Sequence, residues 1–373
     1  MTDAVRGFVR RDLRAAVVPW ALARVLVVGS LALARFAVDH LKHAERPVQL
    51  GQGLFAWDAA FYRDIAEHGY GSVHSGALRF FPLVPLLARG VGVAFLGNDA
   101  AALVVVANGS ALLFGGLIYR LARLETGDAR MAVRAAWFAA VFPPAMALVL
   151  GYAEATFLLL SVAMFLALRT RRFEWSTPFG VLAGLTRPVG VLLALPAAVE
   201  ASRAWRGAST RQRAARASAV LAGPIGAGIY LLWVRYAYGD AWLPLSIQNN
   251  REHRGGFVDP FTRTYDGLAD LLHGDRFGSG LHVLWMAVFV VLVVVLLRRL
   301  PLSYGLYAAA MVAVNLSARN LDSFERYAMS AFPLVFAVAL LTDRPEVERP
   351  VLVVSAAGLV GYSVLGFLGV YVP

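Results

Sequence analysis

The chain has 373 residues, of which 59% are hydrophobic and 16% are charged, and it contains no cysteine. Soluble globular proteins carry about 25% charged residues, so this composition excludes a soluble enzyme and a disordered chain. The absence of cysteine excludes disulfides and thiolate metal sites. The net charge of +11 comes almost entirely from arginine, with Lys42 as the single lysine. These arginines cluster between apolar segments, which is typical of membrane topology and predicts no nucleic-acid partner.

Apolar segments long enough to cross about 30 Å of hydrocarbon recur along the chain. The first, residues 15–38, follows an arginine-rich start, and we interpret it as an uncleaved span whose N-terminus lies in the cytoplasm. The other predicted spans are residues 100–119, 131–150, 155–168, 218–238, 281–297, 304–316, 327–341 and 351–370. The pattern predicts an all-α, polytopic bundle of about 9–11 membrane helices, forming one integral membrane domain over residues 1–373.

Two apolar segments do not fit a simple crossing. Residues 80–97 contain Pro82, Pro85 and Arg89, which favours an interfacial or re-entrant helix. Residues 178–200 are interrupted near Arg187 and have basic flanks at both ends. Two basic flanks cannot both obey the positive-inside rule around one crossing, so we predict a re-entrant hairpin with both ends in the cytoplasm. Its tip is expected to line a water-filled cavity.

The first extracytoplasmic loop, predicted over residues 39–97, contains an amphipathic segment. Trp57, Phe61 and Ile65 recur at helical spacing, which predicts a short helix at the membrane surface. Asp58 stands where this helix begins and has two interpretations. It is either an N-cap that accepts backbone N–H bonds, or a carboxylate kept ionised by the helix dipole and able to act as a general base.

Polar residues gather at the other predicted extracytoplasmic positions. Glu154 begins a span, where it either complements the helix dipole or binds acceptor hydroxyls. The second long outer loop, residues 239–280, carries Gln248, Arg251 and Arg254. Amides suit the recognition of sugars and arginines suit that of phosphates, whereas an ordinary loop with extended arginines would also fit.

Several arginines stand in or near the apolar segments. Arg326, followed by Tyr327, leads into a late span and either reaches the interface or holds a lipid-linked phosphate. Arg24 and Arg187 lie within apolar stretches, where a charge costs at least about 2.5 kcal/mol. Arg24 and Arg187 are therefore both candidates for a functional role.

Four separated blocks of this sequence resemble the phosphatidylinositol-glycan class V mannosyltransferases, which include the second mannosyltransferase of GPI-anchor assembly and its bacterial relatives. The blocks are Trp57-Asp58 through Tyr70 with Phe80-Phe81-Pro82-Leu83, Gly151-Tyr152-Ala153-Glu154 with Leu185-Thr186-Arg187-Pro188, Gly239-Asp240 with Gln248, and Arg326-Tyr327 with Phe332-Pro333-Leu334. The resemblance covers roughly residues 57–341. It implies the GT-C architecture, a polyprenyl-phosphate mannose donor, an extracytoplasmic active site and an essential acidic residue at Asp58.

One departure from the family pattern concerns a metal. Many GT-C enzymes place two acidic residues almost side by side in this loop, but here Ala59 and Ala60 follow Asp58, and the next acid is Asp64. The sequence does not support a two-carboxylate metal site, and it leaves a divalent metal open.

The sequence therefore predicts a glycosyltransferase of the cell membrane. From the resemblance, the enzyme is expected to move a mannosyl or similar hexosyl residue, with inversion, from a polyprenyl-phosphate donor to a hydroxyl of an extracytoplasmic glycan or glycolipid, with Asp58 as the general base. The predicted substrate-binding residues are Trp57, Tyr62, Glu154, Arg187, Gln248, Arg251, Arg254, Arg326 and Tyr327. A transporter or lipid flippase with a polar intramembrane cavity is the alternative, and a structural subunit is a third interpretation.

Overall fold

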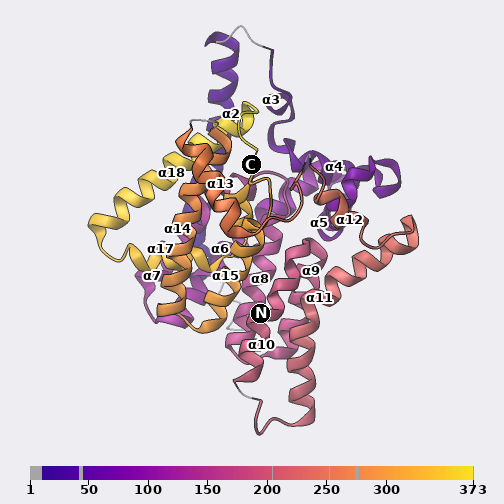
Figure 1. The fold of residues 1–373 in the computed structure, drawn as a ribbon, viewed down its shortest axis with the longest axis vertical. Coiled ribbons are helices and arrows are strands. Elements are labelled where there is room, and N and C mark those ends of the chain that lie inside the picture. The colour runs from indigo at the N-terminus through magenta and orange to yellow at the C-terminus, as the bar shows by residue number, and fades with distance from the viewer. Residues whose placement is uncertain (1–10, 42–44, 204, 252, 274–276, 373) are drawn as a thin grey trace. The chain divides into compact units, whose positions relative to one another are not determined.

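The computed structural model describes residues 11–41, 45–203, 205–251, 253–273 and 277–372 (Figure 1). Within these ranges the chain is helical, as predicted, and its only extended pairing is an isolated bridge between Phe257 and Ala318. Arg6, Arg10 and Lys42 lie outside the described residues. Among the described helices, five are long and apolar enough to cross a membrane. They are α2 (Leu13–Leu41), α6 (Asp99–Thr126), α11 (Thr210–Tyr238), α14 (Phe277–Arg299) and α18 (Pro345–Phe367).

The chain forms two compact units. Unit 1 comprises Met1–Ser72, Val84–Leu159 and Val338–Pro373, and unit 2 comprises Val73–Leu83 and Leu160–Ala337. Helices α8 (Glu154–Arg169) and α17 (Pro333–Leu341) each begin in one unit and end in the other.

Unit 1 is built around α2, α6, α7 (Ala129–Val141) and α18, which pack against one another. Small residues allow close approach: a Cβ added to Gly115 of α6 would lie 3.0 Å from the Cβ of Ala16. The shorter elements are α3 (Val48–Gln52), η2 (Gly53–Phe55), α4 (Asp58–His68), η3 (Tyr70–Ser72), α5 (Leu83–Gly92), η5 (Val93–Phe95) and η6 (Pro143–Leu148).

The predicted span over residues 131–150 is not one continuous helix. Helix α7 ends at Val141, and Pro143 and Pro144 begin the 3₁₀ helix η6. Proline has no N–H to donate and its ring clashes with the preceding turn, so the proline pair ends the α-helix. The chain then leaves helical geometry before α8 begins at Glu154.

Unit 2 is organised around two tightly packed helices, α9 (Phe173–Thr186) and α11. Thr177 bonds Ser218 through their hydroxyls at 3.0 Å, and a Cβ on Gly180 would lie 2.6 Å from that of Ala222. Further along, Gly184 meets the backbone of α11 at residues 223–227. The contacts advance in the same direction on both helices, so α9 and α11 are parallel and their N-termini lie at the same end.

The segment between these two helices reverses the chain. Arg187 follows α9 in an extended conformation, and the chain continues through η7 (Pro188–Leu193) and α10 (Ala194–Ser202). The remaining elements of unit 2 are η4 (Ser75–Arg79), α12 (Leu243–Gln248), α13 (Pro260–Leu272), α15 (Leu302–Leu316) and α16 (Phe324–Met329).

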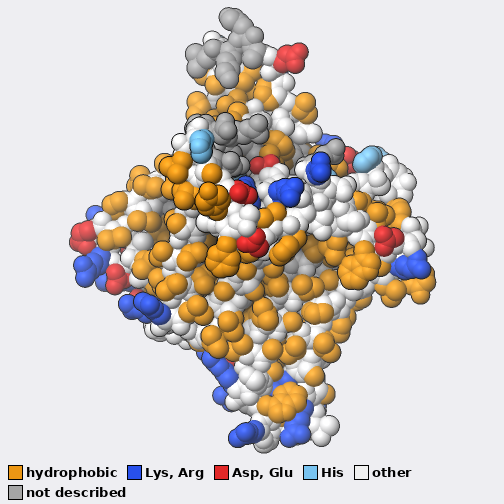
Figure 2. All heavy atoms as spheres, viewed as in Figure 1, with side chains coloured by type: hydrophobic (Ala, Val, Ile, Leu, Met, Phe, Trp, Pro, Cys, Tyr) orange, Lys and Arg blue, Asp and Glu red, His pale blue; other side chains and the backbone are white. Residues whose placement is uncertain are grey.

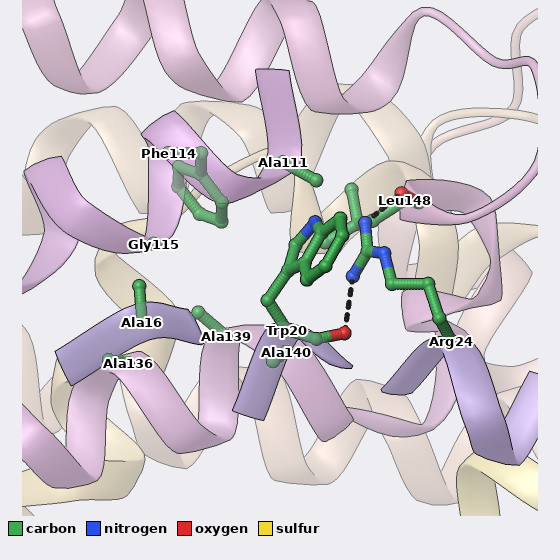
Figure 3. A pocket seen from close by; sticks show the side chains of 10 residues that line it. All are labelled: Ala16, Trp20, Arg24, Ala111, Phe114, Gly115, Ala136, Ala139, Ala140 and Leu148. Carbon is green, nitrogen blue, oxygen red and sulfur yellow. Dashed lines mark hydrogen bonds between the residues drawn. The ribbon is translucent and has the colours of Figure 1, made fainter. Parts of the chain in front are cut away.

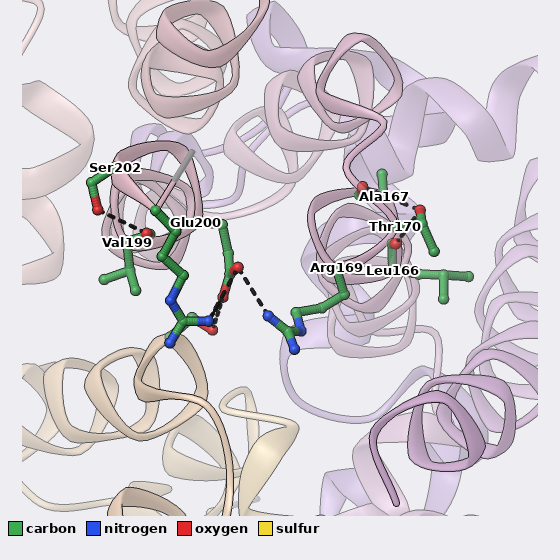
Figure 4. A network of polar contacts seen from close by, with 9 residues as sticks. Leu166, Ala167, Arg169, Thr170, Val199, Glu200 and Ser202 are labelled. Carbon is green, nitrogen blue, oxygen red and sulfur yellow. Dashed lines mark hydrogen bonds and ion pairs between the residues drawn. The ribbon is translucent and has the colours of Figure 1, made fainter. Parts of the chain in front are cut away.

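A buried carboxylate connects three helices of unit 2 (Figure 4). Glu200 of α10 accepts a hydrogen bond from Arg169 at 2.9 Å and from Arg203 at 3.1 Å. The hydroxyl of Ser303, at the start of α15, donates to the same carboxylate at 2.6 Å. Because a buried charge is tolerated only with such partners, Glu200 joins the end of α8 to α10 and α15.

Candidate functional site

Asp58 occupies the first turn of α4 in unit 1. It is the first helical residue, and Trp57 holds the N-cap position with no side-chain cap. The N-cap interpretation of Asp58 is therefore wrong by one position, because the chain turns into the helix through Trp57 at φ 59°. The half-buried Asp58 carboxylate still lies at the N-terminal, positive end of the α4 dipole.

Trp57 is strained and tethered. A positive φ in a bulky residue costs about 1–3 kcal/mol and is typical of functional sites. Its indole N–H donates to the carbonyl of Gly366 in α18 at 2.9 Å. This bond holds the entry to α4 against the C-terminal helix, so the indole N–H of Trp57 supports Asp58.

The rest of α4 is fixed by packing and by one arginine. Its buried residues are Ala59, Tyr62, Ile65 and Ala66, so the predicted face of Trp57, Phe61 and Ile65 is only partly the buried one. At the other end of the helix, Arg89 of α5 donates to the carbonyl of Ala66 at 3.0 Å. Tyr62 is 5% exposed, and it contributes to the core of unit 1.

The segment before α8 lies against the start of α4. The backbone N–H of Gly151 donates to the carbonyl of Leu54 at 3.2 Å, and a Cβ on Gly151 would lie 3.5 Å from that of Ala59. Glu154 opens α8 and is 3% exposed. Both predicted acids of unit 1 thus stand in the first turn of a helix.

Arg24 holds this same segment from inside the helix bundle (Figure 3). Its guanidinium donates to the carbonyls of Leu148 at 2.7 Å and Trp20 at 3.1 Å, and to the amide oxygen of Asn108 at 2.8 Å. Asn108 in turn donates to the carbonyl of Val149 at 3.0 Å. The acceptors around Arg24 are neutral oxygens of α2, α6 and the end of η6, so these contacts account for Arg24 without a ligand.

Three arginines of unit 2 converge on one aromatic ring. The guanidinium carbons of Arg254, Arg326 and Arg187 lie 4.3, 4.5 and 5.2 Å from the centre of the Tyr327 ring. We call these four residues the arginine cluster. Arg326 is 1% exposed and Arg187 is 9% exposed, so at least two of these charges are removed from bulk water.

The electrostatics of the arginine cluster favour an anion. Burial lowers the pKa of Arg254, Tyr327 opposes that shift, and the like charges of Arg187 and Arg326 lower this pKa further. The Nη1 atom of Arg254 is buried and has no hydrogen-bond partner among the described residues. A phosphate offers several acceptor oxygens that match the planar donor fork of arginine, and its charge would relieve the mutual repulsion of the three cations.

Polar residues that sequence reasoning missed orient the arginine cluster. Asn315 of α15 accepts a hydrogen bond from Arg254, and the hydroxyl of Ser330 accepts one from Arg187 at 3.1 Å. Apart from these two contacts, Glu325, which precedes Arg326 in sequence, pairs with His282 at 2.7 Å, and both side chains are buried. Asn315 had a detectable signal, since an amide in an apolar segment is unusual, whereas Ser330 had none.

The structure does not bring every predicted residue to the arginine cluster. Arg251 is exposed, and it makes no hydrogen bond or ion pair with a described residue. Gln248 ends α12, and its backbone carbonyl accepts the N–H of Arg254 at 3.0 Å. Among the described residues, no group of three or more His, Asp or Glu is arranged to hold a metal ion.

Comparison with known proteins does not assign this chain to a family. No family model matches the chain, and no curated protein matches it. The crystal structure of the Archaeoglobus fulgidus oligosaccharyltransferase with zinc and sulfate aligns with a TM-score of 0.45 at 16% identity, over 95% of this chain and 52% of its own. The archaeal oligosaccharyltransferase with an inhibitory peptide and a dolichol-phosphate aligns with a TM-score of 0.45 at 14% identity, over 97% and 56%.

The apo form of the A. fulgidus enzyme aligns with a TM-score of 0.47 at 13% identity, over 98% of this chain and 57% of its own. This chain therefore spans just over half the length of those proteins. An alignment at this level does not assign a function.

Proposed function

We propose that this chain is a membrane glycosyltransferase of the GT-C type that uses a polyprenyl-phosphate-linked hexose, with mannose as the expected sugar. The observation that carries the proposal is the arginine cluster, in which Arg187, Arg254 and Arg326 surround Tyr327. The sequence blocks shared with the phosphatidylinositol-glycan class V mannosyltransferases support the choice of donor, and two of those blocks contain Arg187, Arg326 and Tyr327.

The proposed reaction is a single displacement. The acceptor hydroxyl oxygen bonds to the anomeric carbon while the bond from that carbon to the phosphate oxygen breaks. The hydroxyl proton passes to the Asp58 carboxylate, which acts as the general base. The bonding electrons leave with the phosphate oxygen, so the lipid phosphate gains one negative charge and the configuration at the anomeric carbon is inverted.

Each charged group has a role in this scheme. Guanidinium donors of Arg187, Arg254 and Arg326 stabilise the charge that develops on the departing phosphate, the kind of preorganised electrostatic stabilisation that lowers a barrier most. The Tyr327 ring gives the three cations a common π surface. Trp57, Tyr62 and Glu154 support the segment around Asp58, consistent with their burial or tethering.

A location in the bilayer suits an enzyme with a lipid-linked donor. A polyprenyl chain confines the sugar phosphate to one depth of the membrane, so the enzyme gains an entropic advantage by being embedded there. We place the reaction at the extracytoplasmic face and propose a glycan or glycolipid hydroxyl as acceptor. Five long apolar helices among the described residues support a multi-pass location.

The decisive experiment compares two aspartates of the same helix. Asp58→Asn keeps the shape of the side chain and removes its basicity, so transfer from labelled polyprenyl-phosphate mannose should fall by about 10²–10⁴ in reconstituted vesicles. Asp64→Asn is the matched control, because Asp64 is paired with Arg63 at 2.9 Å and is 44% exposed. Full activity of Asp58→Asn would refute the assignment of the base, and equal losses in both variants would indicate damage to α4.

A further inference from the structure

The parallel packing of α9 and α11 gathers exposed basic and aromatic side chains at one end of unit 2. Figure 2 shows basic side chains over the lower end of α10 and α11. We call this group the basic end. Its exposed residues come from the starts of both helices and the turns that precede them: Arg171, Arg172, Trp175, Trp205, Arg206, Arg211 and Arg213.

The described residues do not balance the charge of the basic end. None of its five arginines forms an ion pair with a described residue, whereas the neighbouring Arg169 and Arg203 are both paired with Glu200. Glu174 is an exposed acid in the first turn of α9. Five positive charges against one negative charge leave a surface that attracts anions.

One of these arginines stands where its backbone would favour glycine. Arg171 ends the turn after α8 at φ 59°, and its N–H donates to the carbonyl of Leu168 at 3.0 Å. Glycine is the usual residue at such a helix C-terminus because it has no Cβ to clash. The side chain of Arg171 is exposed, so the strain is not offset by burial.

The position of the basic end points to the surface of a bilayer. It includes the first turn of α11, whose 29 residues are long and apolar enough to cross a membrane. Trp175 is 58% exposed and Trp205 is 42% exposed, and tryptophan is enriched at the level of lipid headgroups. Exposed indoles beside arginines that form no ion pair with a described residue match a surface that is apolar on one side and anionic on the other.

We propose that the basic end binds the headgroups of anionic phospholipids and enriches them around the start of α11. This binding is independent of the transferase activity. Arginine forks contact the lipid phosphates, the net positive charge selects lipids with a negative headgroup, and the two indoles lie at the boundary with the acyl chains. The proposal goes beyond orientation of the chain, because it predicts a local lipid composition that differs from the bulk membrane.

The absence of native cysteine allows a clean test. Ala214 is exposed next to Arg213, so the full chain with Ala214→Cys can carry one bimane label in nanodiscs of phosphatidylcholine. A fixed minor fraction of the lipid is replaced by brominated phosphatidylglycerol or by brominated phosphatidylcholine. At low ionic strength we expect the anionic quencher to be about threefold or more effective, with the difference shrinking as salt is added.

Two variants decide whether the basic end is responsible. The combined Arg206→Gln, Arg211→Gln and Arg213→Gln variant should lose most of the preference for the anionic lipid. The control, Arg235→Gln with Arg319→Gln, removes exposed arginines from the far end of α11 and from the turn after α15, and it should keep that preference. Equal quenching by the two lipids, or an equal loss in both variants, would overturn the proposal.

Arg171→Gly keeps the proposal testable if the triple variant does not fold. Glycine relaxes the backbone at φ 59°, so this variant should be as stable as the parent chain or more stable. It should nevertheless show a weaker preference for the anionic lipid because one cation is lost. An unchanged preference in this well-folded variant would contradict a lipid role for Arg171.

Discussion

At the scale of single residues, the arginine cluster makes a graded prediction. Arg326 is almost fully buried and its guanidinium stacks near Tyr327. Lysine keeps the charge but lacks the planar fork, whereas glutamine removes the charge. We expect the KM for the lipid-linked donor to rise about tenfold in Arg326→Lys and more in Arg326→Gln, because a charged hydrogen bond contributes about 1.5–3 kcal/mol.

The control for this prediction is Arg251. It is exposed and stands three residues before Arg254 in the same loop, but it lies outside the arginine cluster. Initial rates at varied donor concentration should leave Arg251→Gln close to the parent chain. A KM that rises equally in Arg251→Gln and Arg326→Gln would show that net charge, and not the cluster, binds the donor.

The residue types of the site were predictable, but their partners were not. Arg187 and Arg326 stand out in sequence because a charge near an apolar segment is costly. Which of the loop arginines joins them depends on the path of the chain: Arg254 is pinned by the backbone bond between its N–H and Gln248, while Arg251, three residues earlier, remains exposed. Spacing along the sequence contains no information about that choice.

At the scale of elements, Arg24 is predicted to hold the segment that follows η6. Replacing it with leucine leaves the carbonyl of Leu148 and the amide oxygen of Asn108 without their donor. Each buried acceptor without a partner costs about 1–3 kcal/mol, so Arg24→Leu should lower the unfolding midpoint clearly, and Arg24→Lys should restore part of it. Scanning fluorimetry of the purified chain measures both.

The matched control for Arg24 is Arg235→Leu, because Arg235 is exposed near the C-terminal end of the span α11. That substitution should leave the midpoint nearly unchanged. An Arg24→Leu chain as stable as the Arg235→Leu chain would mean that other donors satisfy these carbonyls and that Arg24 has a different role.

The packing of α9 on α11 gives a second prediction at this scale. A Cβ at Gly226 would overlap the carbonyl of Val181 and lie 3.0 Å from the Cα of Gly184, so Gly226→Ala must push the helices apart. Overpacking of this kind costs about 1–3 kcal/mol or more. Gly228 of the same helix has nothing within 4 Å, and Gly228→Ala should stabilise the helix by up to about 1 kcal/mol.

The thermal unfolding midpoints of the two variants separate the effect of packing from that of helix propensity. Both variants replace a glycine of α11 with alanine, so they differ only in what surrounds the new methyl group. Similar midpoints for Gly226→Ala and Gly228→Ala would contradict the tight parallel pair. This pair also marks a limit of sequence reasoning. The sequence predicts an interruption of residues 178–200 near Arg187, but the contact of Gly184 with α11 could not be predicted without knowing which helix packs there.

At the scale of the whole molecule, hydrophobic blocks predict helices well and crossings less well. Blocks such as residues 100–119 and 218–238 are seen as parts of α6 and α11, because a long apolar helix satisfies all its backbone groups internally. Residues 131–150 are also predominantly apolar but contain Pro143 and Pro144. There the backbone carbonyls depend on Arg24 and Asn108, which are distant in sequence.

The orientation of the chain in the membrane leads to the last prediction. We expect the start of α11 in the cytoplasm and the loops after α4 and α12 outside, because most arginines lie on the first side. Single cysteines at the exposed positions Ser72, Asn249 and Ala214 report on these sites, and no native cysteine interferes. In sealed right-side-out vesicles, an impermeant maleimide should label Ser72→Cys and Asn249→Cys.

Ala214→Cys should react only after the vesicles are permeabilised, which also serves as the control that its thiol is reactive. The result has a consequence for both proposals. A base at Asp58 needs the loop after α4 outside, a phosphate site at Arg254 needs the loop after α12 outside, and an anionic-lipid surface at Arg211 needs the start of α11 in the cytoplasm. Labelling of Ala214→Cys together with Ser72→Cys from outside would contradict the predicted orientation of the start of α11.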